Sequence, residues 1–188
     1  MMRDMDHAVQ RLIKALRLGE KVVIYGDYDV DGTVGTVLLY RFLQRLGVRV
    51  SYFIPKRLKD GYGLTEQTLM ELKTRQARLI ITVDNGARAV EEAAFLKRMG
   101  IDLLITDHHP PGEQMPEALA MVNPMRPDCP YPFKGLSGAG VAFKLLEALD
   151  HQLNVDGFWE RTGKIRANLQ QELDLVAFAT ISDSMPMT

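Results

Sequence analysis

Three short apolar runs, each followed directly by polar or acidic side chains, are the feature that most constrains the fold of this chain. The runs span Lys21–Tyr25, Leu79–Val83 and Asp102–Thr106. Their length and β-branched content are typical of buried strands, and amphipathic helical patterns separate them. This alternation predicts an α/β fold with a mostly parallel sheet flanked by helices. Because ligands bind beyond the carboxyl ends of such strands, we expect the functional site there.

Further periodic segments complete the expected fold. An amphipathic helix opens the chain and ends near Gly19, a residue type that suits a helix C-terminus. After Pro111 the periodicity weakens, residues 123–134 are expected to form an ordered loop, and residues 154–168 are a polar stretch. The other expected helices span residues 33–46, 65–74, 89–99, 141–149 and 173–181, and the other expected strands span 48–54 and 121–122.

The side chains that follow the three apolar runs favour a metal centre. The first run leads into Asp-Tyr-Asp-Val-Asp-Gly, the second into Asp-Asn-Gly and the third into Asp-His-His. Like charges this close repel one another unless a cation or a basic group lies among them. Carboxylates and imidazoles are suitable ligands for Mn²⁺, Mg²⁺ or Zn²⁺. The candidate site residues are Asp27, Asp29, Asp31, Asp84, Asp107, His108 and His109.

The two adjacent histidines are expected to have different roles. Adjacent side chains leave a strand end in opposing directions, so His108 and His109 are not expected to bind the same ion. One imidazole is then the better candidate for a metal ligand, and the other faces the substrate. A catalytic triad drawn from Ser137 and His109 lacks the nucleophile-elbow sequence that would support it.

Two other interpretations of the first acidic motif fail. A helix-loop-helix calcium site needs a helix before the loop and a glutamate at its twelfth position. Here a strand precedes Asp27, and the twelfth position is Leu38. Gly32 belongs to no nucleotide-binding glycine pattern, and it instead favours a tight turn into the next helix.

Composition sets the general class of protein. With 188 residues, of which 46% are hydrophobic and 25% charged, the chain suits one globular domain. The net charge of -1 gives no overall attraction for nucleic acid, so a polyanion must meet a local patch or a metal site. The single cysteine, Cys129, excludes an internal disulfide and fits a reducing compartment. Since neither a membrane-spanning run nor a secretory signal is evident, we expect a soluble, cytoplasmic protein without membrane contact.

Together these motifs resemble the DHH phosphoesterase superfamily, and most closely its RecJ-like single-strand-specific exonucleases. The resemblance runs from Met5 to the end of the sequence and includes the strings DYDVDG, GYGL, VDNG, TDHH, VNPMRPDCPYPFK, GLSGAGVAFKL and LDLVAFATISD. It implies a parallel α/β domain with its active site at the strand ends and with two divalent cations, Mn²⁺ or Mg²⁺. It also implies that residues 1–188 are a truncated catalytic domain, because RecJ-like proteins continue into a DHH-associated domain and often an OB-fold.

The resemblance implies a role for each residue of the candidate site. Asp29 would bind the first metal, Asp31 the second, and Asp84 would bridge both. His108 and Asp183 would bind the second metal, and Asp27 would lie in or next to the shell of the first metal. His109 would donate to a phosphate oxygen. Asp107 would orient a ligand histidine.

The resemblance also implies the activity, a metal-dependent phosphodiesterase that degrades single-stranded DNA from its 5′ end to 5′-mononucleotides in DNA repair or recombination. Tyr25 occupies the position of a histidine in the pyrophosphatase branch, which argues against a pyrophosphatase. A phosphodiesterase for short oligonucleotides or cyclic dinucleotides and a non-catalytic DNA-binding scaffold remain open alternatives. A single-strand-binding protein or a helicase is a candidate partner, and the sequence does not define the oligomeric state. The candidate contacts to the DNA backbone are Lys56, Arg57, Lys59, Arg126 and Lys134.

Overall fold

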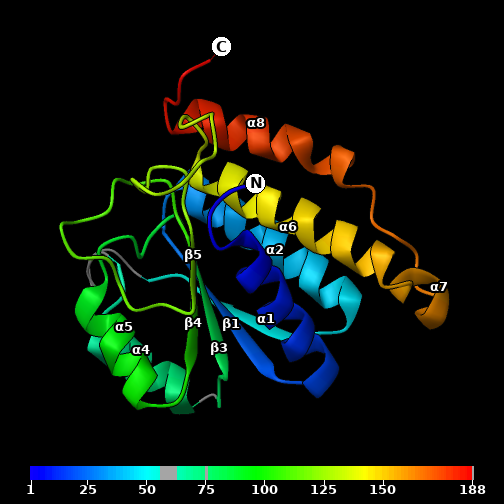
Figure 1. Cartoon of the computed structure of the whole chain (residues 1–188), viewed down its shortest axis with the longest axis horizontal. Coiled ribbons are helices and arrows are strands. Elements are labelled where there is room, and N and C mark those ends of the chain that lie inside the picture. Colours follow the sequence, from blue (N-terminus) through cyan, green and yellow to red (C-terminus); the bar gives the residue numbers. More distant parts are fainter. Residues whose placement is uncertain (56–62, 75, 188) are drawn as a thin grey trace.

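A single parallel sheet forms the centre of the molecule. The computed structural model describes residues 1–55, 63–74 and 76–187. In this part of the chain all strand pairings are parallel, and the strand order is β2-β1-β3-β4-β5 (Figure 1). This architecture confirms the expected α/β fold. The strands are β1 (Lys21–Gly26), β2 (Arg49–Phe53), β3 (Leu79–Val83), β4 (Asp102–Thr106) and β5 (Ala120–Val122).

The strand order reverses between β1 and β3. From β1 the chain crosses to β2 at one edge of the sheet, and it then returns to β3 on the other side of β1. The carboxyl ends of β1 and β3 therefore flank a switch point, where diverging connections leave a crevice. Gly26 and Val83 pair at these strand ends, and Asp27 and Asp84 follow them directly. The topology alone brings these two carboxylates to one place.

Helices cover both faces of the sheet. One face carries α1 (Met5–Leu18), α2 (Val30–Leu46) and α6 (Gly138–Val155), and the other carries α4 (Glu66–Thr74) and α5 (Val90–Arg98) (Figure 1). Successive side chains of β1 serve the two cores in turn, since Ile24 packs on the first face and Tyr25 on the second. Because both faces are buried, the strands are continuous apolar runs in the sequence.

An outer helix, α8 (Leu173–Ser182), packs over α2 and α6 (Figure 1). It follows α7 (Phe158–Thr162) and a short 3-10 turn, η1 (Leu169–Glu172). Apolar side chains are distributed around the whole of α8, and Phe178 and Ile181 remain 56% and 62% exposed. No helix in the described part of the chain is long and apolar enough to cross a membrane.

Two helices begin three residues earlier than the sequence pattern predicts. Helices α2 and α6 start at Val30 and Gly138, ahead of the expected starts at Thr33 and Val141, because Asp29 and Ser137 act as N-caps. The Asp29 carboxylate and the Ser137 hydroxyl each accept a hydrogen bond from the backbone N–H three residues later, at 2.9 and 3.2 Å. These early starts place Asp31 and Gly138 in the first turns of their helices.

The loops agree with the sequence analysis in part. Residues 123–134 contain no helix or strand, as expected. The stretch 154–168, marked only as polar, contains the short helix α7, because Phe158 and Trp159 are buried and fix that turn against the core. Residues 56–62, which include the candidate DNA contacts Lys56, Arg57 and Lys59, lie outside the described residues.

Candidate metal centre

The acidic and histidine side chains that the sequence singles out converge beyond the carboxyl edge of the sheet. Three groups each place their ligand atoms within 4.8 Å of one another. The groups are Asp27, Asp29 and Asp84; Asp31, His108 and Asp183; and Asp84, His108 and His109. Because Asp84 and His108 each belong to two groups, the three groups form one continuous cluster, called the acidic cluster below.

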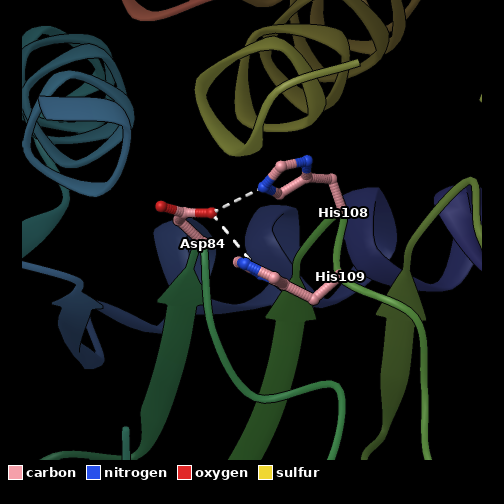
Figure 2. A group of neighbouring side chains, drawn as sticks. All are labelled: Asp84, His108 and His109. Atoms are coloured by element: carbon pink, nitrogen blue, oxygen red, sulfur yellow. Dashed lines mark ion pairs between the residues drawn. The ribbon is translucent and has the colours of Figure 1, made fainter. Parts of the chain in front are cut away.

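Asp84 lies at the centre of the acidic cluster. Figure 2 shows the rings of His108 and His109 directed toward its carboxylate from the end of the neighbouring strand. Asp84 Oδ1 is 3.1 Å from His108 Nε2 and 3.8 Å from His109 Nδ1. His108 Nε2 also lies 3.8 Å from Asp31 Oδ2 and 3.5 Å from Asp183 Oδ2.

The two histidines do not diverge as we expected. Their ring centroids are 4.5 Å apart, and both rings turn toward Asp84 (Figure 2). The expectation was wrong on direction because β4 ends at Thr106, so the alternation of a strand does not extend to His108 and His109. The rings nevertheless have different surroundings, since the His108 side chain is 7% exposed and the His109 side chain 44%.

Two buried atoms of the acidic cluster have no hydrogen-bond partner among the described residues. They are Asp84 Oδ1 and His108 Nε2, which approach each other without hydrogen-bond geometry. Leaving a buried polar group unsatisfied costs about 1–3 kcal/mol. A divalent cation between them would satisfy both atoms at once, and carboxylate oxygens with one imidazole nitrogen form a donor set that suits Mn²⁺. The residues present therefore fit a divalent metal centre.

Three carboxyl groups of the acidic cluster, those of Asp27, Asp84 and Asp183, have raised pKa values. Burial raises the pKa of Asp84 to about 7, and the contact with His108 only partly offsets this effect. Burial likewise raises the pKa of Asp27 and of Asp183. For His108, burial lowers the pKa, but the neighbouring Asp84 carboxylate outweighs it and the net change is upward. Cation binding must therefore displace protons from the cluster.

Asp107 holds the ring of the second histidine rather than that of the first. Its Oδ1 accepts hydrogen bonds from His109 Nδ1 and from the backbone N–H of His108, both at 2.8 Å, and its Oδ2 accepts one from the N–H of Ala87 at 2.8 Å. The hydrogen bond from His109 raises the pKa of this histidine to about 9. We expected Asp107 to orient a ligand histidine, but the structure shows that its ring partner is His109, the more exposed of the two.

The carboxylate of Asp31 is fixed by a helix that the sequence analysis did not connect with the site. Oδ2 accepts a hydrogen bond from the N–H of Gly138 at 2.5 Å, and Oδ1 accepts one from the N–H of Ala139 at 2.9 Å. Both donors belong to the first turn of α6. The available signal was the string GLSGAG before a helix, which suggests a close approach at that turn but does not identify the residue approached.

The backbone of Asp84 is unusual. Its φ angle of 63° lies in the left-handed region, which few residues other than glycine adopt. Its N–H donates to the carbonyl of Thr106 at 3.0 Å, which ties the turn after β3 to the end of β4. Residues in this region persist only where their surroundings hold them, and they concentrate at functional sites. The strained turn fixes the direction of the central carboxylate.

The basic residues expected to contact DNA divide into two sets. Arg126 is 8% exposed, and its guanidinium donates to the carboxylates of Asp4 and Asp128 and to a backbone carbonyl. Lys134 donates to two carbonyl oxygens within the 123–134 loop. Both side chains are thus engaged in contacts that hold the fold. The other candidates lie outside the described residues: Lys56, Arg57 and Lys59.

The fold and the site define a class, which is a parallel α/β domain with a carboxylate–imidazole metal centre at the switch point of its sheet. Residues 21–180 match the family model described as "DHH family, N-terminal domain", and the chain belongs to the DHH family. This match confirms the resemblance that the motifs indicate.

Proteins named single-stranded-DNA-specific exonuclease RecJ are similar to nearly the whole chain. Identity to the protein of Bacillus subtilis (strain 168) is 44% over 186 residues, covering 99% of this chain and 22% of the relative. Identity to the protein of Salmonella typhimurium (strain LT2) is 41% over 183 residues, covering 97% and 32%. The "Crystal structure of exonuclease RecJ bound to manganese" matches with a TM-score of 0.82 and 37% identity, covering 99% of this chain and 44% of that one. The chain spans about a fifth to a third of the length of these curated relatives.

Proposed function

We propose that this domain is the catalytic part of a metal-dependent phosphodiesterase that degrades single-stranded DNA from its 5′ end and releases 5′-mononucleotides. The observation that carries the proposal is the pair of buried atoms Asp84 Oδ1 and His108 Nε2, which lie 3.1 Å apart within a group of carboxylates and have no hydrogen-bond partner among the described residues. Similarity to RecJ exonucleases, with structures described as bound to manganese and in complex with Mg²⁺, supports the substrate and the choice of Mn²⁺ or Mg²⁺.

Two sets of side chains would each hold a divalent cation, and Asp84 would contribute to both. Asp27, Asp29 and Asp84 form one set of candidate ligands. Asp31, His108 and Asp183 form the other, and Asp84 approaches this set through its contact with His108. The shared carboxylate would fix the position of one cation relative to the other.

The protein's own groups have defined tasks in this proposal. Bound divalent cations supply an activated water and neutralise charge on the scissile phosphate. His109 carries a proton near neutral pH, because its pKa is about 9, and Asp107 holds its Nδ1 so that Nε2 can donate to a phosphate oxygen. The α6 turn orients Asp31 through two backbone N–H groups.

The remaining parts of the proposal concern location and partners. A DNA substrate and the single cysteine support a cytoplasmic location. Lys56, Arg57 and Lys59 remain the proposed contacts to the DNA backbone, and a single-strand-binding protein or a helicase remains a candidate partner. With few such contacts, binding of a strand by this domain alone should be weak and should fall steeply with salt.

Digestion of end-labelled single-stranded DNA tests the proposal. With Mn²⁺ the chain should release labelled mononucleotides from a 5′-labelled strand, slowly and without processivity, and EDTA should stop the release. Asp84→Asn serves as the inactive control. Hydrolysis of dinucleotides or cyclic dinucleotides alone would identify a small-substrate enzyme instead. Mn²⁺ binding without hydrolysis of any of these substrates would favour a DNA-binding scaffold.

A further inference from the structure

The first turn of α6 touches two carboxylates of the acidic cluster that come from different parts of the fold. We propose that this turn is a positioning element of the metal centre, and that residue 138 is a glycine because Asp84 occupies the space that a side chain would need. The inference rests on the proposed function, since it concerns the same carboxylates.

The contact with Asp31 is made by hydrogen bonds. The N–H groups of Gly138 and Ala139 are among the donors that a helix leaves without partners in its first turn. One donor engages each oxygen of the buried Asp31 carboxylate, at 2.5 and 2.9 Å, so the group is held in one orientation.

The contact with Asp84 is made by close packing. A Cβ atom added to Gly138 would lie 2.6 Å from Asp84 Cβ, 2.6 Å from its Oδ1 and 2.8 Å from its Cγ. These distances are far below ordinary van der Waals contact between non-bonded heavy atoms. Any side chain at this position would therefore displace either the helix or the carboxylate.

Neither Asp84 nor helix α6 can move without disturbing contacts of the acidic cluster. Asp84 lies on a left-handed turn that is tied to Thr106 by its N–H, and its Oδ1 is also the atom closest to His108. Helix α6 is flanked on another side by α2, where a Cβ on Gly35 would lie 3.1 Å from Ala139 Cα. If α6 retreats, the two hydrogen bonds to Asp31 lengthen. If Asp84 yields, its carboxylate leaves its place beside His108.

The same turn contains a matched control position. A Cβ on Gly140 would meet Leu136 atoms at 3.5 and 3.6 Å and Ser137 Oγ at 3.6 Å, which is ordinary contact. Gly138→Ala and Gly140→Ala add the same methyl group to the same turn and change helix propensity in the same direction. A difference between the two variants therefore reports the contact with Asp84.

The test compares Mn²⁺ affinity, measured by isothermal titration calorimetry, for the unaltered chain and the two variants. Gly138→Ala should weaken Mn²⁺ binding by about tenfold or more, the scale for loss of a group that supports metal ligands. Gly140→Ala should keep the affinity of the unaltered chain. Equal affinity in all three proteins, or equal loss in both variants, would overturn the inference. Failure of the unaltered chain to bind Mn²⁺ would instead refute the proposed function.

Denaturation by urea in EDTA separates positioning from general stability. A purely structural role would lower the free energy of unfolding of Gly138→Ala and leave the Mn²⁺ affinity of its folded form unchanged, which would overturn the inference. If Gly138→Ala does not fold, Ser137→Ala tests the same turn without adding an atom, because it removes the cap hydrogen bond to Gly140. Ser137→Ala should then show a several-fold loss of Mn²⁺ affinity, and an unchanged affinity would overturn the inference.

Discussion

The two ends of the sheet differ in how their buried charged side chains are paired. At the amino ends of the strands, Arg11 is 6% exposed and donates to Glu20 and Asp102 at 2.6 Å each and to the carbonyl of Arg78 at 3.3 Å. At the carboxyl ends, Asp84 and His108 are also buried, but Asp84 Oδ1 and His108 Nε2 have no hydrogen-bond partner among the described residues. The first arrangement supplies its own counter-charges and stabilises the fold. The second leaves room for a charge that the chain does not contain.

Loss of the central carboxylate should have the largest effect. Asn is among the residues that tolerate the left-handed backbone of Asp84, so Asp84→Asn should fold while removing a ligand charge. Mn²⁺-dependent hydrolysis of single-stranded DNA should fall by about 1000-fold or more. Nucleotide release measured against a circular-dichroism control for folding checks this, and near-normal activity in a folded variant would remove the acidic cluster from the mechanism.

Substitution of His108 and of His109 should have different effects on metal binding and on turnover. His109→Ala should slow turnover by about 100-fold, the scale for loss of one donor to the transition state, and should leave Mn²⁺ affinity nearly unchanged. His108→Ala should instead weaken Mn²⁺ binding by about tenfold or more. Calorimetric titration with Mn²⁺ alongside single-turnover kinetics distinguishes the two effects. An equal loss of metal in both variants would show that His109 is also a ligand.

At the opposite end of the sheet, Arg11→Met should change stability and leave the chemistry intact. Without the guanidinium, the Glu20 carboxylate and the carbonyl of Arg78 lose their hydrogen-bond donor. Asp102 is 42% exposed, so its carboxylate can bind water instead. The free energy of unfolding should fall by about 2 kcal/mol. Urea denaturation checks this value. Arg17→Met, which removes an exposed ion pair with Asp156, is the matched control and should change stability little.

The smallest expected effect is a pH dependence of stability and of Mn²⁺ affinity, which arises at the carboxyl ends of the strands. The pKa of Asp84 is about 7 in the fold against 3.8 ordinarily, so the folded state binds the extra proton between these values. Without metal, stability should therefore be higher near pH 5 and decline as the pH rises through 7. Mn²⁺ affinity should change in the opposite sense, falling by about tenfold per pH unit below 7 if one proton is displaced. Urea denaturation without metal at pH 5, 6 and 7 checks the sign for stability, and Mn²⁺ titrations at pH 6, 7 and 8 check the sign for affinity. A pH-independent affinity would contradict this assignment.

The sequence predicts the residues of the candidate site better than it predicts the contacts that orient them, and the reason is physical. Parallel strands that end in carboxylates must bring those carboxylates to one edge, so the topology follows from local patterns. The partners of Asp107 and Asp31 depend instead on where a turn or a distant helix lies, and no spacing in the sequence encodes this. The residues of α6 that contact Asp31 are 107 and 108 positions away from it.

Charged loop residues show the same limit. Arg126 and Lys134 lie in a proline-rich loop, where a basic side chain is usually solvated, and this made them candidates for contact with DNA. In the structure Lys134 donates to two carbonyl groups of that loop, which have no partner in a helix or strand, and Arg126 ties the loop to Asp4 and to the carbonyl of Met121 in β5. Composition alone does not distinguish a lysine that donates hydrogen bonds to backbone carbonyl groups from one that binds a ligand.

The position of Asp183 at the end of α8 has a consequence for the order in which the protein is made. Once the ribosome has added His109, three residues after the end of β4, it has synthesised Asp27, Asp29, Asp31, Asp84 and both histidines, yet the group of Asp31, His108 and Asp183 is still incomplete. That group closes only after α6 and α8 have been synthesised and have packed on α2. In a nascent chain the candidate ligands Asp27, Asp29 and Asp84 can therefore come together before Asp183 is available to join Asp31 and His108.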